Sequence, residues 1–455
     1  MNAAEPCVDD GNAALLTDLY QLTMLQAYWR EGMEAEATFS LFARRLPKSR
    51  NFLLACGLDD VLRYLETVRF TGEALDYLST FDQFSPDFLE WLERLRFTGD
   101  VHAVPEGTPV FANEPILEVT APIPQAQLVE TFVMNQIHLQ TVLASKAARV
   151  VEAARGRAVV DFGLRRMHGT DAGVKAARAF HVAGVAATSN VLAGRVYGLQ
   201  VTGTMAHSYV QAHDEELEAF RVFATLYPGT TLLVDTYDSL EGVRKVVRLA
   251  REMGEAFAVR AIRLDSGDLI ELAFESRRML DQAGLQGVEI FASGGLDENE
   301  VDRIVRAGAP ITGFGVGTGM GVSADAPSFD IAYKLTSYAG RGRLKLSPGK
   351  PILPGPKQVF RGEEDGLAVR DVIARAEEEL PGRPLLVPVM RDGTRLPEGH
   401  ADLDQARARA REEIGRLPAR VLALEPADPP YPVELSPALE RYMREIAEAA
   451  IKGSR

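Results

Sequence analysis

TLLVDTYDSLEGVRKVVRLAREMGEAFAVRAIRLDSGD, residues 231–268, decides the fold of this chain. Its two ends, TLLVDTYD and AIRLDSGD, are short apolar runs that finish in polar residues, which is typical of strands. Between them, SLEGVRKVVRLAREMG has apolar residues at the spacing of an amphipathic helix. The strand-like runs are continuously apolar, as in parallel sheets that are covered on both faces. The stretch therefore predicts a strand–helix–strand unit.

The same alternation of strands and helices continues on both sides of this stretch, and it begins at about Arg157. Seven strand-like runs alternate with helical stretches: RAVVDFG, AATSN, GLQVTGT, TLLVDTYD, AIRLDSGD, VEIFASGG and PITGFGVGT. The repeat is close to the ~30 residues expected of one strand–helix–strand unit. We predict an irregular (β/α) barrel over residues 136–335, with an open parallel sheet as the alternative.

The remaining segments predict a second domain. LLTDLYQLTMLQAYWREG has helical spacing and ends at Gly32, whereas VHAVPEGTPVFANEPILEVTAP is rich in strands and turns. PLLVPVMRDGTRLPEG predicts a strand pair with its turn at Asp392 and Gly393. We expect these tail strands to pair with the segment near residues 100–120. The predicted domain is α+β and β-sandwich-like, built from residues 1–135 with 336–455.

Composition excludes several classes of function. The formal net charge of −14 argues against a protein that binds nucleic acid through its phosphates. No apolar run approaches the ~20 residues of a membrane helix. Cys7 and Cys56 form neither a disulfide framework nor a zinc-ligand pattern, and the N-terminus does not read as a signal peptide. We expect a cytoplasmic protein.

Polar clusters follow almost every predicted strand of the middle region. In a β/α barrel these strand ends share one face, and that face carries the active site. Considered alone, His207 is better interpreted as a structural histidine. Its position at such a strand end predicts a cleft shared with four charged residues: Arg165, Asp235, Arg263 and Asp265.

Two glycine-rich turns, ASGGLDE and GFGVGTG, follow the last two strands. Glycines let backbone N–H groups approach an anion closely, and barrels often bind phosphate on these loops. The alternative is a pair of tight turns without a ligand. Neither a dinucleotide-binding fingerprint nor a P-loop is present.

RLDSGD and DFGLRR carry charged side chains at two further strand ends. Asp265 and Asp268 can accept from ribose hydroxyls or help to hold Mg²⁺, while Arg263 can bind a phosphate or carboxylate. The alternative is an ion pair with a helix cap. Phe162 beside Arg165 and Arg166 suits a flat ligand with a carboxylate, although a core phenylalanine beside two solvent-facing arginines gives the same pattern.

Taken together and in this order, the motifs TDLYQLTM, DFGLRR, TSNVLAG, GTMAHS, RLDSGD, ASGGLDE, GFGVGT and LSPGKPILPGPKQVFR resemble nicotinate phosphoribosyltransferases. The resemblance runs from about Leu16 to Arg361. It departs at Met167 and His168, where the family more often has a small residue and glutamine, so it assigns those two positions no role.

The resemblance implies an enzyme that joins nicotinate to phosphoribosyl pyrophosphate, giving nicotinate mononucleotide and pyrophosphate in NAD salvage. It further implies ATP as a coupled co-substrate, Mg²⁺ as the cofactor, an irregular barrel and a homodimer. His207 would be phosphorylated by ATP and would act with Arg165 and Asp265 in catalysis.

Ligand contacts are also implied by the resemblance. Tyr20 would reach the neighbouring subunit's site and stack on the pyridine ring opposite Phe162. The other nicotinate contacts would be Arg165, Thr204 and Arg263, with Arg165 and Arg166 not separated by the sequence. Phosphoribosyl pyrophosphate would be held by Arg263, Asp265, Gly294, Gly295, Gly315, Gly317 and Thr318.

Three other functions fit the same fold. Related nicotinamide-preferring enzymes have an aspartate near the position of Asn190, and ATSN offers no carboxylate there, which favours the acid. A quinolinate transferase calls for a more basic pocket. A non-catalytic barrel that binds phosphorylated ligands would not need His207, Arg165 and Asp265 together.

Overall fold

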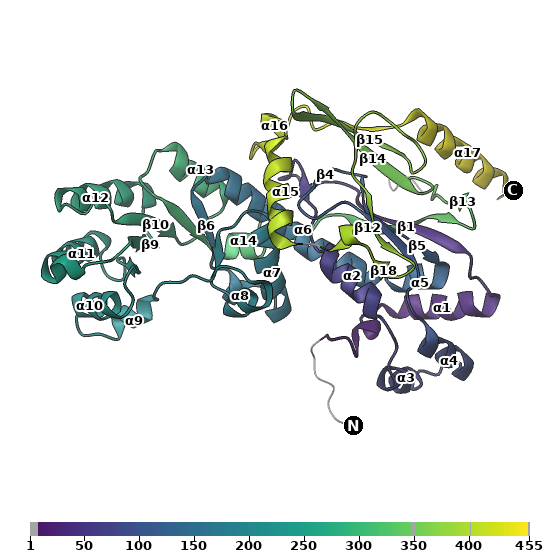
Figure 1. The fold of residues 1–455 in the computed structure, drawn as a ribbon, viewed down its shortest axis with the longest axis horizontal. Helices are drawn as coiled ribbons and strands as arrows, with labels where there is room; N and C mark the ends of the chain where they lie inside the picture. Colours follow the sequence, from purple (N-terminus) through teal and green to yellow (C-terminus); the bar gives the residue numbers. More distant parts are fainter. Residues whose placement is uncertain (1–7, 347–351, 401, 454–455) are drawn as a thin grey trace. The chain divides into compact units, whose positions relative to one another are not determined.

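The computed structural model describes residues 8–346, 352–400 and 402–453. By its internal contacts the chain divides into two units, one of Met1–Val142 with Ser328–Arg455 and one of Leu143–Pro327 (Figure 1). Cys7 and residues 347–351 of the LSPGKPILPGPKQVFR motif lie outside the described residues. Cys56 is buried and forms no disulfide with another described residue. In the described ranges no helix is long and apolar enough to cross a membrane.

The unit of residues 143–327 is built on one parallel sheet. Its strands are β6 (Ala158–Asp161), β7 (Ala187–Thr188), β8 (Thr231–Leu233), β9 (Ala261–Leu264), β10 (Glu289–Ser293) and β11 (Gly313–Val316). They lie in the order β7-β6-β11-β10-β9-β8, and every pairing is parallel. The first strand therefore pairs with the last, as the predicted barrel requires and an open doubly wound sheet does not.

The barrel is open on one side. The third predicted strand is reduced to a single bridge between Val201 and Thr188 of β7. This bridge adds one position to the sheet beside β7. Within residues 143–327, all of which are described, Val201 does not pair with β8, so the two ends of the sheet do not meet. The prediction of an irregular barrel is confirmed in its strand order, with a sheet that curls without closing.

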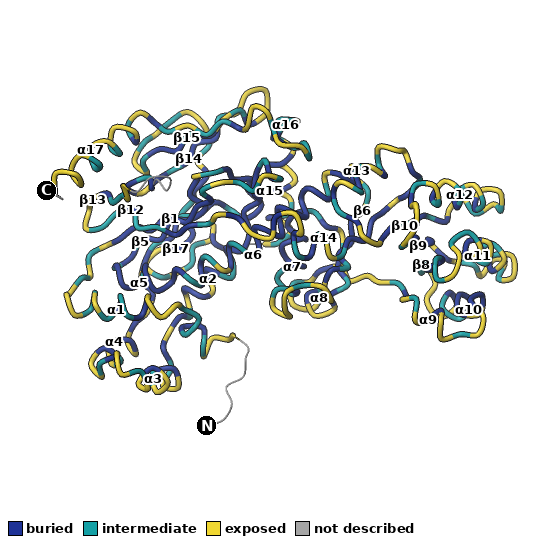
Figure 2. The backbone as a smooth tube through the Cα atoms, turned by 180° about the vertical axis from the view of Figure 1, so that it is seen from behind, coloured by how far each residue is buried: buried dark blue, intermediate teal, exposed yellow. Residues whose placement is uncertain are grey.

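Helices follow the strands of this unit. They are α7 (Thr170–Val182), α8 (Val191–Tyr197), α9 (His207–Gln211), α10 (Glu216–Leu226), α11 (Ser239–Met253), α12 (Leu269–Gln282), α13 (Glu298–Arg306) and α14 (Thr318–Gly321), with 3₁₀ turns at Leu164–Arg166 and Gly254–Ala256. Val243, Val246 and Leu249 of α11 are fully buried, whereas its charged face is exposed (Figure 2). This pattern follows from the helical spacing of the sequence.

The other unit combines strands from both ends of the chain. Its seven-stranded sheet has the order β13 (Arg341–Gly342), β12 (Ile331–Tyr338), β1 (Glu36–Ala43), β5 (Pro115–Pro122), β3 (Asp100–Ala103), β17 (Val387–Arg391) and β18 (Thr394–Arg395). The predicted pairing of the tail with residues 100–120 is confirmed, because β17 pairs with β3. The predicted turn is confirmed as well, since Asp392 and Gly393 both have positive φ between β17 and β18.

Smaller sheets and helices complete this unit. A four-stranded sheet has the order β16 (Arg383–Pro384), β14 (Lys357–Glu364), β15 (Leu367–Arg375) and β19 (Val433–Leu435), and β2 (Leu53–Leu54) pairs with β4 (Pro109–Val110). The helices are α1 (Leu19–Glu31), α2 (Leu58–Thr67), α3 (Gly72–Leu78), α4 (Pro86–Arg94), α5 (Ile123–Leu128), α15 (Leu403–Gly415), α16 (Ala419–Leu422) and α17 (Pro437–Gly453), with 3₁₀ turns at Ala13–Leu15 and Pro397–Gly399. The 24-residue α6 (Glu130–Ala153) runs through the boundary between the units in the sequence. Gly32 ends α1 in the left-handed conformation, as predicted.

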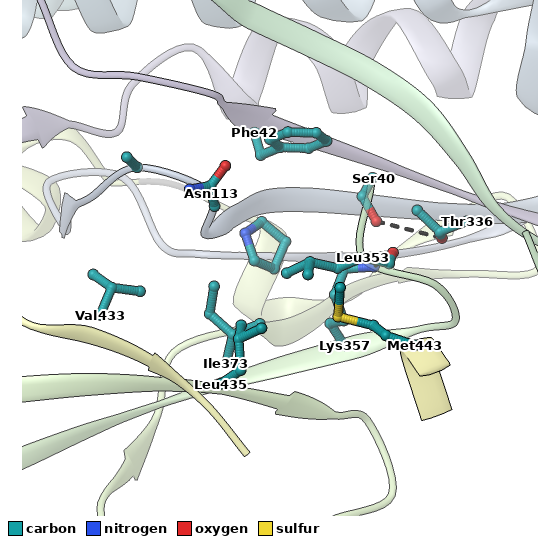
Figure 3. Close-up of a pocket in the computed structure, with 12 residues that line it drawn as sticks. Ser40, Phe42, Asn113, Thr336, Leu353, Lys357, Ile373, Val433, Leu435 and Met443 are labelled. Atoms are coloured by element: carbon teal, nitrogen blue, oxygen red, sulfur yellow. Dashed lines mark hydrogen bonds between the residues drawn. The ribbon is translucent and has the colours of Figure 1, made fainter. Parts of the chain in front are cut away.

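A cavity of about 270 Å³ lies in this unit among β1, β12, β14, β15, β19 and α17 (Figure 3). Its polar wall includes Lys357, whose Nζ is 2.9 Å from Glu118 Oε1. The same ammonium donates to the carbonyl oxygens of Leu353 and Gly355. Burial lowers the pKa of Lys357, against the opposing attraction of Glu118. Since all three ammonium hydrogens are used within the fold, this charge is structural.

Candidate active site

His207 lies between two neighbouring strand ends of the parallel sheet. It is the first residue of α9, and its ring is half-buried. Its Nδ1 is 3.2 Å from Oγ1 of Thr236, in the loop after β8. Its Nε2 is 3.7 Å from Oδ2 of Asp265, in the loop after β9. The ring thus faces polar groups from both loops, which excludes the reading of His207 as a core residue.

The carboxylate of Asp265 is held in a fixed orientation. Ser293, the last residue of β10, donates from Oγ to Asp265 Oδ1 over 2.5 Å. Nη1 of Arg263 is 3.6 Å from the same oxygen. Because Oδ1 is occupied on this side, Oδ2 is the oxygen that faces His207.

Arg263 connects three of the predicted strand ends. Its Nη2 donates to the carbonyl oxygen of Met205 over 2.8 Å, and its guanidinium carbon is 5.9 Å from the ring centroid of Phe162. Burial lowers the pKa of Arg263. The negative charges of Asp265 and Asp235 oppose this shift, whereas the positive charge of Arg165 adds to it. Guanidinium stays protonated in proteins, so the site holds a permanent positive charge. Arg165 is the arginine of DFGLRR whose charge acts on this site.

Two of the predicted phosphate-binding glycines have structural reasons of their own. Gly294 has φ +86°, and a Cβ there would lie 1.8 Å from the carbonyl oxygen of Asp265. A Cβ on Gly315 would lie 2.5 Å from the ring of Phe162. These glycines therefore allow the Asp265 loop and the Phe162 ring to take their positions.

The other predicted phosphate contacts face open space or begin a helix. A Cβ on Gly295 would meet nothing within 4 Å. Gly317 precedes Thr318, the first residue of α14. The first N–H groups of a helix have no intrahelical acceptors, so this turn presents backbone donors beside the Thr318 hydroxyl.

Most acidic residues at these strand ends are helix caps. Asp238, Asp268 and Asp297 accept hydrogen bonds from the first backbone N–H groups of α11, α12 and α13. The cap at Asp268 agrees with the alternative of a helix cap for this residue, and it uses one oxygen, Oδ1.

Asp235 differs from these caps. Its Oδ2 accepts from the backbone N–H of Asp265 and from Ser266 Oγ. Its Oδ1 is buried with no hydrogen-bond partner among the described residues. The described part of the chain contains no cluster of three or more potential metal ligands from His, Cys, Asp and Glu. The unpartnered oxygen of Asp235 fits a Mg²⁺ ion held by one or two carboxylates together with phosphate oxygens, the arrangement this ion prefers.

The remaining predicted residues lie as follows. Tyr20, in α1, is 48% exposed, and its hydroxyl donates to Glu130 Oε2 over 3.0 Å. Burial, together with the Glu130 charge, raises the pKa of Tyr20. Thr204 is half-buried, and its Oγ1 is 3.3 Å from the carbonyl oxygen of Met205. Arg165 and Arg166 are exposed in the 3₁₀ turn after β6, and His168 is exposed nearby.

Asn190 has a structural role. It is buried, its side-chain oxygen accepts from Ala193 N, and its amide donates to the carbonyl oxygen of Gly173. Because Asn190 caps α8, the residue type at this position supplies no contact-based argument for the acid over the amide.

Two hydroxyl residues at the site were not predicted. Thr236 contacts His207, and Ser293 contacts Asp265. Both lie within motifs that mark strand ends, DTYD and ASGG. Their position was a usable signal, but only the fold reveals which neighbour each hydroxyl meets.

Comparison with known proteins gives a consistent result. Residues 15–138 match the model of the nicotinate phosphoribosyltransferase N-terminal domain, and residues 157–372 match that of the nicotinate phosphoribosyltransferase family. A nicotinate phosphoribosyltransferase of Mycobacterium tuberculosis is 56% identical over 434 residues, covering 95% of this chain and 93% of the relative. One from Bacillus subtilis is 40% identical over 381 residues, 82% of this chain and 78% of the relative.

A solved structure agrees. The crystal structure of human nicotinic acid phosphoribosyltransferase superposes with a TM-score of 0.84 at 29% identity, covering 95% of this chain and all of the human one. With the strand-end cluster of His207, Asp265, Arg263 and Phe162 in place, these matches show that the chain belongs to the nicotinate phosphoribosyltransferase family of enzymes.

Proposed function

We propose that this protein transfers the phosphoribosyl group of phosphoribosyl pyrophosphate to nicotinate, and that ATP is consumed through phosphorylation of His207. The observation that carries the proposal is the position of His207 between Thr236 and Asp265, beside a permanent positive charge on Arg263. The products would be nicotinate mononucleotide and pyrophosphate, in NAD salvage. The cysteine usage of the sequence supports a cytoplasmic location.

The nicotinate ring would bind against Phe162. An aromatic ring offers a flat apolar surface, and Gly315 leaves room for that ring. Arg165 and Arg263 would attract the carboxylate of nicotinate, with Thr204 as a nearby hydroxyl donor. The amide of nicotinamide carries no charge for these arginines, so the acid is the expected substrate.

The sugar and phosphate groups would bind along the carboxyl ends of β9, β10 and β11. Asp265 would accept from the ribose hydroxyls. The 5′-phosphate would meet the backbone donors of the Gly294–Gly295 and Gly317–Thr318 turns, a common arrangement in barrels. Mg²⁺ would neutralise charge on the departing pyrophosphate, and Asp235 and Asp265 are the carboxylates that fit such an ion.

His207 would act as the phosphoryl acceptor. A neutral imidazole is a competent nucleophile near neutral pH, because its ordinary pKa lies near that range. Phosphorylation would add negative charge beside Asp265 and Arg263, altering how the site binds its anionic substrates. The sugar transfer itself would rely on positioning and electrostatic stabilisation.

A homodimer would complete each site with Tyr20 of the other subunit, stacked on the pyridine ring opposite Phe162. In support, Leu19 and Tyr20 are 49% and 48% exposed. Helix α8 also exposes Val191, Leu192 and Val196, each by more than half. Neighbouring exposed apolar side chains are typical of interaction surfaces.

The direct test is pyrophosphate release with phosphoribosyl pyrophosphate and Mg²⁺, comparing nicotinate with nicotinamide, each with and without ATP. We expect release with nicotinate, stimulated by ATP, and loss of the ATP stimulation in His207→Ala. A preference for nicotinamide would overturn the roles of Arg165 and Arg263. Undiminished ATP coupling in His207→Ala would remove His207 from the mechanism.

A further inference from the structure

The hydroxyl of Thr236 is in contact with the residue proposed to carry the phosphoryl group. Its Oγ1 is 3.2 Å from Nδ1 of His207, and Asp265 Oδ2 is 3.7 Å from Nε2 on the other side of the ring. These contacts come from loops after different strands, β8 and β9. The ring is therefore hydrogen-bonded at Nδ1 and faces a carboxylate, at electrostatic contact distance, at Nε2.

The chemistry of the two partners decides the tautomer of the ring. An ionised carboxylate only accepts hydrogen bonds, whereas a threonine hydroxyl both donates and accepts. Asp265 therefore favours the proton on Nε2. Nδ1 then carries the lone pair, and Thr236 is the partner that can adapt by donating to it.

We propose that Thr236 is a positioning residue that fixes the orientation and tautomer of His207 by donating its hydroxyl hydrogen bond to Nδ1. Its role in phosphoryl transfer rests on the proposed function, whereas the tautomer does not. In the transfer, the Nδ1 lone pair forms the N–P bond as the bond from the γ-phosphorus to the ADP oxygen breaks. The proton on Nε2 stays in place facing Asp265, and the hydroxyl of Thr236 turns to a phosphoryl oxygen.

Thr236→Val tests this role, because valine keeps the branched shape and removes the hydroxyl. Thr236→Ser keeps the hydroxyl and removes the methyl group. Thr225→Val is the matched control, since Thr225 is an exposed threonine of α10 whose hydroxyl bonds to the carbonyl oxygen of Arg221. The full-length proteins are labelled with ¹⁵N in their histidine rings, and the His207 signals are assigned by their loss in His207→Asn.

Without ATP, we expect wild type, Thr236→Ser and Thr225→Val to show a pyridine-type Nδ1 and a protonated Nε2 on His207. In Thr236→Val, the two nitrogen signals should shift toward an average of both tautomers. With radiolabelled ATP, the initial rate of His207 labelling should fall about tenfold in Thr236→Val, or about 1.4 kcal/mol, the size of one hydrogen bond. Thr236→Ser should recover most of that rate.

Unchanged nitrogen signals in Thr236→Val would overturn the inference, as would failure of Thr236→Ser to recover labelling. A fall of similar size in Thr225→Val would also overturn it, because any loss of a threonine hydroxyl would then suffice. If wild type itself is not labelled at His207, the proposed function fails, and the spectra without ATP still decide whether Thr236 fixes the tautomer.

Discussion

Adjacent glycines of the ASGG turn differ in what surrounds them. Gly294 and Gly295 both have positive φ, at +86° and +64°. Only Gly294 lies against other backbone, because the loop after β9 passes directly over it. The sequence treats the two glycines as equivalent, and the fold separates them.

Replacing each glycine with alanine should distinguish the energetic cost of the backbone collision from the cost of the left-handed conformation. Gly294→Ala should lower the free energy of unfolding by roughly 3 kcal/mol or more, because its Cβ would collide with a carbonyl that cannot turn away. Gly295→Ala should lower it by only about 1–2 kcal/mol, the usual penalty of the left-handed conformation. Urea unfolding followed by circular dichroism measures both, and equal losses would contradict the close approach.

The residues of the site divide by what sequence can reveal. Strand-end position was enough to predict that His207, Asp265 and Arg263 lie close together. A helix cap was one of two predicted alternatives for Asp268, whereas the cap at Asn190 and the contact of Thr236 with His207 were not predicted, because a polar side chain bonds to whichever backbone or ring the fold brings within about 3 Å. The preceding strand marks where a residue lies but not which partner it meets.

At the scale of elements, the strand rhythm predicted the barrel order from β6 to β11. It did not predict the opening beside β8, because a run such as GLQVTGT has strand-like composition whether or not it finds a partner. Pairing between the chain's two ends was predicted for β3 with β17. The pairing of β1 with β12 was not, since neither run carries a signal for its distant partner.

A buried charge cluster on β14 and β15 predicts how stability depends on pH. Arg361 pairs with Asp371 through three hydrogen bonds, and Tyr431 donates to the same carboxylate. Burial, then the negative charge of Asp371, raises the pKa of Glu114 well above its ordinary value, although Arg361 opposes the shift. The folded state therefore keeps Glu114 protonated over a range in which the unfolded chain has already ionised.

The contribution of Glu114 to the stability of the fold should decrease as pH rises. A group whose pKa is raised on folding contributes its full stability below its unfolded pKa, about 4.3 for glutamate, and loses it as pH rises toward the folded pKa. Glu114→Gln copies the protonated carboxyl and cannot ionise, so its melting temperature relative to wild type should increase from pH 4.5 to pH 7.5. Glu364→Gln, at an exposed position of β14, is the control for net charge. A constant difference across this range would contradict the protonated Glu114.

At the scale of the whole molecule, one chain carries both the strand-end cluster and the tyrosine proposed to serve a second copy. Tyr20 belongs to the unit built from the chain ends, and the cluster belongs to the unit of residues 143–327. The hydroxyl of Tyr20 is bonded to Glu130 of its own chain, and Tyr20 as a whole residue is exposed. Sequence motifs reveal the presence of these groups, whereas the subunit that each one serves is a property of the assembly.

Complementation between two inactive variants tests that assembly. Tyr20→Ala should lose most of its activity with nicotinate because the stacking surface is removed, and His207→Ala should lose its ATP-stimulated activity. A heterodimer of the two, isolated through a different tag on each chain, contains one site with His207 from one subunit and Tyr20 from the other. We expect about half of the ATP-stimulated rate of the wild-type dimer, because one of its two sites is intact. If Tyr20 serves its own chain, neither site is intact, and the heterodimer should show no more activity than its parents. Pyrophosphate release from the purified heterodimer, with both parental homodimers assayed alongside, decides between the two arrangements.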